Sequence, residues 1–89
     1  ILNMGGVSMI GNKIKALLNI TNKNTNDICE MLNIIDTAFY RKIKKNTFKA
    51  DELIKIAILT NTKLAFIDEN NNPLITFDEN DIKQEKNND

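Results

Sequence analysis

Apolar residues recur every three or four positions along the first 60 residues, which is the spacing of helices with one buried face. The pattern predicts four amphipathic helices: one that begins at Ile10, a short one after Asn24, one from Asp36 to Lys45, and one that follows Thr47. The residues predicted to face inward are Ile10, Ile14, Leu17, Leu18, Ile28, Met31, Leu32, Phe39, Ile43, Phe48, Leu53, Ile56 and Ala57.

Asparagine marks the expected ends of these helices. Asn24 and Asp27 have the spacing of a capping box, in which each side chain accepts a hydrogen bond from the backbone amide of the other residue. Four further asparagines fall where a helix is expected to end, namely Asn22, Asn33, Asn46 and Asn61. Asparagine tolerates the left-handed conformation of a helix C-cap better than other non-glycine residues, so these positions predict the helix boundaries.

After Lys63 the helical period gives way to two short apolar runs. Leu64–Ile67 and Leu74–Phe77 flank a polar loop at residues 68–73, a pattern typical of a β-hairpin. The predicted fold is therefore mainly α, with four compact helices followed by a C-terminal hairpin. The domain spans residues 9–77; residues 1–8 are expected to be a non-native remnant or disordered leader, and residues 78–89 an acidic polar tail with one helical turn around 80–83.

An isolated two-stranded hairpin is marginal in water, so this one must pack on another surface. Ile54 and Ile58 form a second apolar stripe on the fourth helix, which the hairpin could cover. Alternatively, two hairpins meet across a dimer, and the sequence leaves both arrangements open. Phe66 is expected in the core with Phe48, and Phe77 either in the core or at a dimer seam.

The inventory of reactive side chains argues against catalysis. The 89 residues include no histidine and a single cysteine, Cys29, which excludes internal disulfides and triads that depend on histidine. We expect Cys29 to be a small buried residue, and the protein to be neither an enzyme nor the holder of a metal or cofactor. No apolar run approaches the ~20 residues that cross a bilayer, so a cytoplasmic protein is expected.

The formal net charge is zero, but the charges are unevenly distributed. Residues 1–49 carry eight basic and three acidic side chains, whereas residues 68–89 carry seven acidic and two basic ones. The densest basic stretch is residues 40–45, and it contains Arg41, the only arginine of the chain. A basic half of this kind favours an anionic partner.

The segment from Asn24 to Asn33 resembles the first motif helix of the Xre-like (lambda-repressor-like) helix-turn-helix family, and the resemblance extends over residues 10–67. Cys29 stands at the small alanine position of that motif, Asn33 at the turn glycine, and Ile34 at the buried aliphatic position after the turn. Phe39 and Ile43 match the inner positions of the second motif helix. Residues 47–57 resemble the fourth helix of the family. The glutamine usual at the Thr25 position and the serine-like residue usual at Ile35 are absent.

The resemblance implies a transcriptional regulator that binds double-stranded DNA, as a homodimer, with the helix at 36–45 in the major groove. Thr25 is implied as a phosphate contact. Asp36, Thr37, Tyr40 and Arg41 are implied to face the bases. The phosphate contacts implied at the end of this helix and in the next loop are Lys44, Lys45 and Lys49.

Other interpretations of these residues stay open at this point. Arg41 is alternatively a solvated residue or the partner of Glu30 or Asp36 in a salt bridge. Asp36 is alternatively the cap of its own helix, one residue late. A different class of function is a protein-interaction module, antitoxin-like or anti-repressor-like, that binds a partner through the hairpin and the stripe of Ile54 and Ile58.

Overall fold

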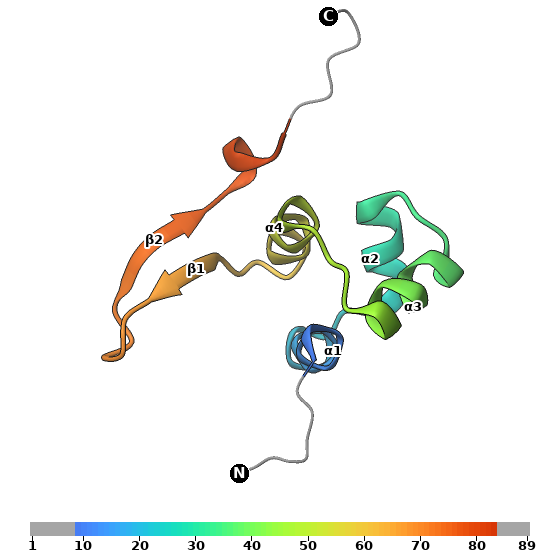
Figure 1. Ribbon diagram of the computed structural model, residues 1–89, viewed down its shortest axis with the longest axis horizontal. Coiled ribbons are helices and arrows are strands. Elements are labelled where there is room, and N and C mark those ends of the chain that lie inside the picture. The colour runs from blue at the N-terminus through green and yellow to red at the C-terminus, as the bar shows by residue number, and fades with distance from the viewer. Residues whose placement is uncertain (1–8, 84–89) are drawn as a thin grey trace, which may run out of the picture.

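The computed structural model describes residues 9–83 and contains four helices, an antiparallel hairpin and a short 3-10 helix (Figure 1). In chain order the elements are α1 (Ile10–Thr21), α2 (Thr25–Leu32), α3 (Asp36–Lys45), α4 (Ala50–Leu59), β1 (Leu64–Ile67), β2 (Pro73–Phe77) and η1 (Glu79–Asp81). The predicted fold class is confirmed. The expected leader at residues 1–8 and the end of the acidic tail lie outside the described residues.

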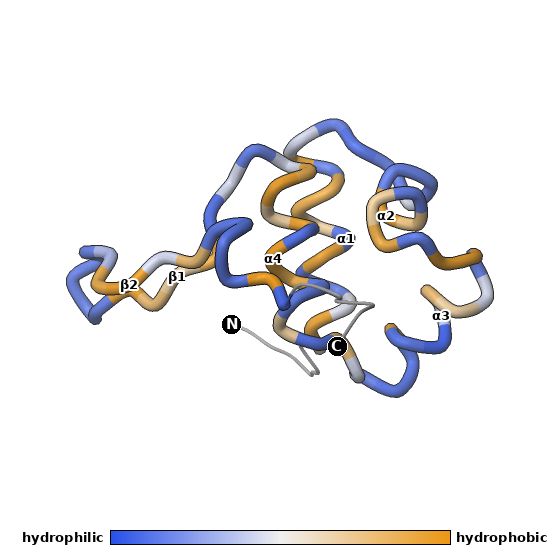
Figure 2. The backbone as a smooth tube through the Cα atoms, turned by 90° about the horizontal axis from the view of Figure 1, so that it is seen from above, coloured by the Kyte–Doolittle hydropathy of each residue, from blue (hydrophilic) through white to orange (hydrophobic). Residues whose placement is uncertain are grey.

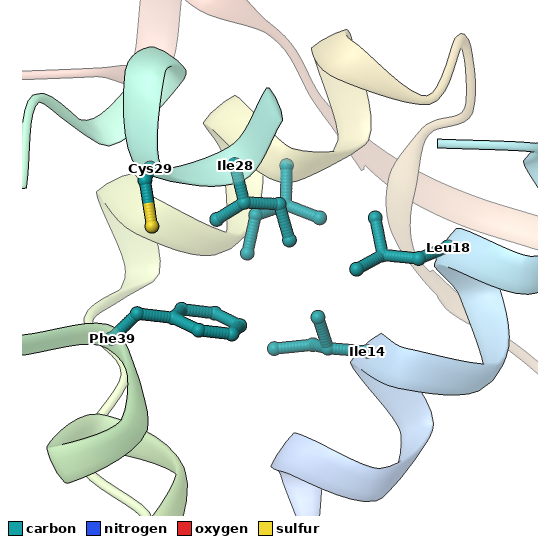
Figure 3. Close-up of a cluster of buried hydrophobic side chains, with 6 residues drawn as sticks. Ile14, Leu18, Ile28, Cys29 and Phe39 are labelled. Atoms are coloured by element: carbon teal, nitrogen blue, oxygen red, sulfur yellow. The ribbon is translucent and has the colours of Figure 1, made fainter. Parts of the chain in front are cut away.

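The four helices enclose one small core. Ile14 and Leu18 of α1 point at Ile28 of α2 and Phe39 of α3, and both Ile28 and Phe39 are completely buried (Figure 3). Ile56 of α4 completes the cluster. Each helix therefore contributes an apolar face to the same volume, which is how short helices with little intrinsic stability become ordered.

Helix ends follow the asparagines. The Asn24 side chain accepts from the Asp27 amide at 3.0 Å, and the Asp27 carboxylate accepts from the Asn24 amide at 3.0 Å, so the predicted capping box is present. The four predicted C-terminal asparagines all have left-handed backbones, with φ between 57° and 61°: Asn22, Asn33, Asn46 and Asn61. This part of the prediction is confirmed.

The fourth helix begins later than predicted. α4 starts at Ala50, and Phe48 lies in the preceding loop, where its ring is half-buried 6.1 Å from the ring of Phe39. The apolar spacing led to the prediction that Phe48 belongs to the helix. Its side chain does pack against the core, but it does so from the loop. Glu52 accepts a hydrogen bond from the Lys49 backbone amide at 2.8 Å, and this bond places the helix start after Lys49.

The hairpin forms with the expected strands, and β2 begins one residue earlier, at Pro73. Leu64 pairs with Phe77 and Phe66 with Ile75, and a β-bulge follows Phe66. The Asp68 carboxylate organises the loop, because it accepts from the backbone amides of Asn70 and Asn72 at 2.8 and 2.9 Å. Those bonds hold the pKa of the Asp68 carboxyl below its usual range, so it is charged at neutral pH.

The stripe of Ile54 and Ile58 is covered in part: Ile54 is 2% exposed, in a helix that α2 and η1 both contact, whereas Ile58 is 39% exposed. The prediction that Phe66 is a core residue is wrong, since it is 65% exposed. Only the foot of the hairpin lies against α4, and the strands extend away from the helices (Figure 1).

The beginning of the acidic tail is ordered against α4. Asp78 caps η1 through a bond from the Asn80 amide at 2.8 Å, and the Lys83 amide donates to the Asp51 carboxylate at 3.2 Å. The predicted helical turn is thus present, one residue earlier than expected. Within residues 9–83, every helix is too short or too polar to cross a lipid bilayer.

Candidate nucleic-acid interface

The outward face of α3 gathers five of the eight residues implied as DNA contacts. They line one shallow hollow on the surface, and all are exposed: Thr37, Tyr40, Arg41, Lys44 and Lys45. The spacing of these residues, three or four apart along a helix, puts them on one side. The hollow thus presents hydroxyl, guanidinium and ammonium donors together.

The opposite face of α3 is anchored in the protein. Phe39 is buried against α1 and α2, and Ile43 lies against Gly11 at the start of α1. A Cβ atom built on Gly11 would lie 2.7 Å from Cγ2 of Ile43, so the two helices approach as closely there as a glycine allows. α3 is consequently a rigid support for whatever its outer face contacts.

Tyr40 lies between the two faces. Its ring meets the ring of Phe39 edge to face at 5.5 Å, yet the residue is 50% exposed. The ring therefore packs at the edge of the core, and half of the residue remains accessible from the α3 hollow.

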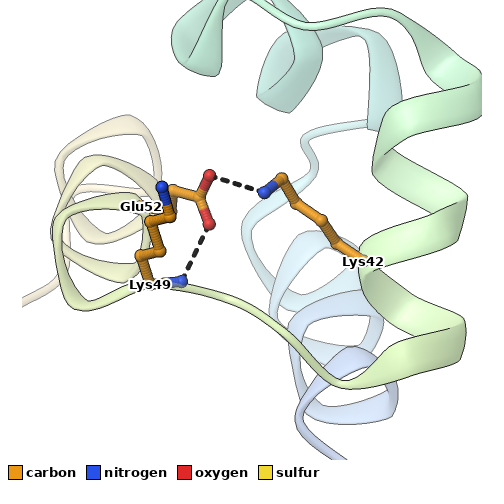
Figure 4. Close-up of polar contacts among 3 residues, drawn as sticks. All are labelled: Lys42, Lys49 and Glu52. Atoms are coloured by element: carbon orange, nitrogen blue, oxygen red, sulfur yellow. Dashed lines mark hydrogen bonds and ion pairs between the residues drawn. The ribbon is translucent and has the colours of Figure 1, made fainter.

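Lys42 differs from the other basic residues of α3 because it points inward. Its Nζ lies 2.8 Å from Oε2 of Glu52 on α4, while the other oxygen of Glu52 accepts from the Lys49 amide (Figure 4). Partial burial acts to raise the pKa of Glu52, but the Lys42 ammonium and the Lys49 amide outweigh it, and the net pKa lies below the usual range. Lys42 is three residues after Phe39, and this helical spacing could have identified it as an inward residue.

Asp36 does not cap α3. The helix begins at Asp36 itself, with Ile35 as the N-cap and no side-chain capping bond. Instead the Asp36 carboxylate accepts a hydrogen bond from the Cys29 thiol at 3.4 Å. Burial, together with this bond and the nearby negative charge, raises the pKa of Cys29, so the thiol stays protonated at neutral pH. Cys29 is 7% exposed, as expected for a small buried residue.

Thr25 lies apart from the α3 hollow, as the first residue of α2. It lines a second shallow hollow together with Lys15 and Lys23. Within the described residues, the backbone amide of Thr25 donates no hydrogen bond, as is usual for the first residue of a helix. Such an amide at the positive end of a helix dipole can accept an anion as partner.

The loop between α3 and α4 holds the last of the implied contacts. Lys49 is exposed at the N-cap of α4, outside the α3 hollow. Asn46 ends α3, and its side chain accepts from the Ile10 amide at 3.2 Å, so this residue also caps α1. The capping role of Asn46 was missed because it joins residues 36 apart in the chain.

The charges of α3 suit the helix itself as well as a ligand. Asp36 is in the first turn, and Lys42, Lys44 and Lys45 are in the last, an arrangement that complements the helix dipole. Arg41 forms no ion pair with any residue from 9 to 83, so the salt bridges considered for it with Glu30 and Asp36 are absent there. Its guanidinium is therefore available in the outer hollow.

The part of the chain that the structure describes holds no cluster of three or more cysteine or carboxylate side chains that could bind a metal ion. Comparison of the chain with protein-family models, with curated proteins and with solved structures finds no match.

Proposed function

We propose that the protein binds double-stranded DNA by placing α3 in the major groove, and that it regulates transcription in the manner of lambda-repressor-like proteins. One observation carries the proposal. α3 buries Phe39, and opposite it exposes a row of polar and basic residues that is unobstructed within the described chain. A major groove about 12 Å wide admits one helix with such a face on a compact support.

Arg41 is the residue best suited to read a base. A guanidinium presents a planar fork of donors that matches O6 and N7 of guanine, which a lysine cannot reproduce. Among the five residues that line the hollow, Arg41 is in the middle: Thr37 lies one helical turn before it, and Lys44 and Lys45 lie about one turn after it. The lysines would meet phosphates and set the register of the helix on the duplex.

The start of α2 supplies a second anchor in this proposal. The Thr25 hydroxyl and backbone amide would bind one phosphate, with Lys15 and Lys23 close to the same hollow. Asp36 is occupied by the Cys29 thiol, and its charge would repel phosphate. We therefore assign Asp36 to the packing of α2 on α3 and not to base contact.

A protein-interaction module is the second candidate function. Burial of Ile54 leaves only Ile58 of the α4 stripe exposed, so this candidate now depends mainly on the hairpin. The exposed apolar side chains of the hairpin favour it, whereas the basic outer face of α3 favours DNA.

Selection from a pooled random-duplex library at about 50 and 200 mM salt tests the proposal. Enrichment of a defined site that Arg41→Ala abolishes is expected for sequence-specific binding. Lys83→Ala is the control, because Lys83 carries the same charge at an exposed position after η1, outside α3 and both hollows. Weak binding without enrichment, lost at the higher salt, would contradict specific recognition and favour the interaction module.

A further inference from the structure

The far half of the hairpin is an exposed apolar surface. Phe66, Ile67, Leu74 and Ile75 are between 57% and 67% exposed, and no charged residue occurs in either strand. Both views of the chain show the hairpin projecting from α4, at the end of the molecule opposite α2 and α3 (Figures 1 and 2).

The apolar side chains lie on both faces of the hairpin. Phe66 and Ile75 are paired across the strands and so share one face, while Ile67, the next residue of β1, points to the other. Leu74 is the extra residue of the bulge and is exposed. Strands that are apolar on both faces are typical of sheets covered on both sides. Within residues 9–83, no backbone hydrogen bond joins either strand to a third element, so the hairpin is held only at its foot.

An apolar groove lies at the foot of the hairpin. It runs between α1 and α4 and is lined mainly by Ile10, Ile14, Leu17, Leu53, Ile56 and Leu64. Lys13 and Lys63 also line it and add positive charge. Because the hairpin projects away from the helices, its own far half does not fill this groove.

We propose that a second copy of the chain occupies this groove, so that the hairpin of each copy packs into the α1–α4 groove of the other. One face of each hairpin then lies on the partner's groove and the other face on the partner's hairpin. This arrangement covers both apolar faces at once and closes around a two-fold axis. It does not depend on DNA binding.

The interface that results reaches the size of a small specific interface. Four side chains of this kind, each more than half exposed, present on the order of 400 Å² of apolar surface. Reciprocal docking buries this patch on each copy together with the smaller groove surface that faces it, on the order of 1,000 Å² in all, which is about the least that a specific interface buries.

Charge complementarity favours a second copy over an unrelated partner. The tip of the hairpin carries Asp68 and Glu69, and the groove carries Lys13 and Lys63. A hairpin laid along the partner's groove brings opposite charges toward each other, while the charge-free strands avoid any like-charge repulsion at the two-fold axis. Depletion of charge at the centre is also characteristic of homodimer interfaces.

Sedimentation equilibrium of the full chain tests the proposal. We expect dimerisation at micromolar concentrations, and an increase of roughly 100-fold in the dissociation constant for Ile75→Asp, because the change occurs twice at a two-fold interface. Ile20→Asp is the matched control: Ile20 is 80% exposed on α1, and its variant should dimerise normally. Far-UV circular dichroism checks that both variants fold.

A further variant tests the groove itself. Ile10 is 37% exposed at the groove and is the first residue of α1, where aspartate suits the helix dipole. Ile10→Asp should weaken the dimer by at least about tenfold. A chain that stays monomeric at millimolar concentration, or a dimer that survives either Ile75→Asp or Ile10→Asp, would overturn the proposal. Loss of DNA binding with the dimer intact would instead count against the proposed function alone.

Discussion

Gly11 and Ile43 hold α1 and α3 together at a separation that admits no additional carbon atom. A Cβ on Gly11 would lie 2.7 Å from Cγ2, 3.1 Å from Cγ1 and 3.2 Å from Cβ of Ile43. All three atoms are the branched Cβ of Ile43 or its direct neighbours, so the contact is not with a flexible end that can move aside. This close approach fixes the position of α3 against α1, and with it the position of the outer face of α3.

Gly11→Ala is therefore expected to destabilise the protein by about 1–2 kcal/mol, because overpacking outweighs the gain in helix propensity. Urea unfolding measures the change. Ala16→Gly, at an exposed position of the same helix, gives the intrinsic difference between the two residues. If the contact is responsible, Gly11→Ala should be less damaging in an Ile43→Ala background, and strictly additive effects would contradict this explanation.

Glu52→Gln is expected to lower the free energy of unfolding at pH 7 by about 1–2 kcal/mol, since it breaks the half-buried pair with Lys42. The pKa of Glu52 is lower in the folded than in the unfolded chain. The pair with Lys42 therefore contributes its full share of folding stability above the unfolded pKa of ~4.3, and this stability is lost as the pH falls through the folded-state pKa. The wild type and the variant should thus converge in acid.

Thermal unfolding from pH 7 down to pH 2 measures this convergence. Glu30→Gln is the control, because Glu30 is exposed and forms no ion pair within residues 9–83. A constant gap between wild type and Glu52→Gln across that range would show that the lost stability comes from packing and not from charge.

Asn46→Gly is expected to cost about 0.5–1 kcal/mol, because it keeps the left-handed backbone but removes the acceptor for the Ile10 amide. Asn46→Ala should cost about 1–2 kcal/mol more, since alanine is strained at φ 57°. Asn33 supplies the comparison: it has φ 60°, and its side chain accepts no such bond within residues 9–83. Equal effects of glycine at 33 and at 46 in urea unfolding would eliminate the capping role.

The sequence was sufficient to predict the helices and their ends, because periodicity and caps are local properties. The capping box of Asn24 and Asp27 and the left-handed asparagines depend only on neighbouring residues. The start of α4 was misplaced because Phe48 reaches the core from a loop, and an apolar side chain has the same signature in either setting.

Features that depend on a distant partner could not be predicted in this way. Nothing near Gly11 in the sequence indicates Ile43, and nothing near Asn46 indicates Ile10. The apolar strands suggested a covered hairpin, but alternation along a strand does not identify which surface covers it, and Phe66 is exposed within the single chain. On α3, the inward direction of Lys42 was predictable from its distance to Phe39, whereas its pairing with Glu52 was not.

Cys29 is expected to react with iodoacetamide at pH 8 at least about 100-fold more slowly in the folded chain than in urea, because burial keeps the thiol neutral and inaccessible. Asp36→Asn should raise the rate several-fold by removing the neighbouring negative charge, although burial remains. Mass spectrometry follows the reaction. A folded-state rate equal to that in urea would contradict the buried position of Cys29.

Substitutions of Arg41 and Lys45 should affect DNA binding in different ways. If Arg41 reads a guanine, Arg41→Ala weakens binding to the selected site by about 1–3 kcal/mol with little effect on random duplex, and Arg41→Lys does not restore it because an ammonium lacks the planar fork. If Lys45 contacts a phosphate, Lys45→Ala weakens binding to every sequence alike and lowers the slope of log K against log salt by about one. Fluorescence anisotropy at several salt concentrations separates the two effects. Variants of both residues that bind like the wild type would exclude the outer face of α3 as the DNA-binding surface.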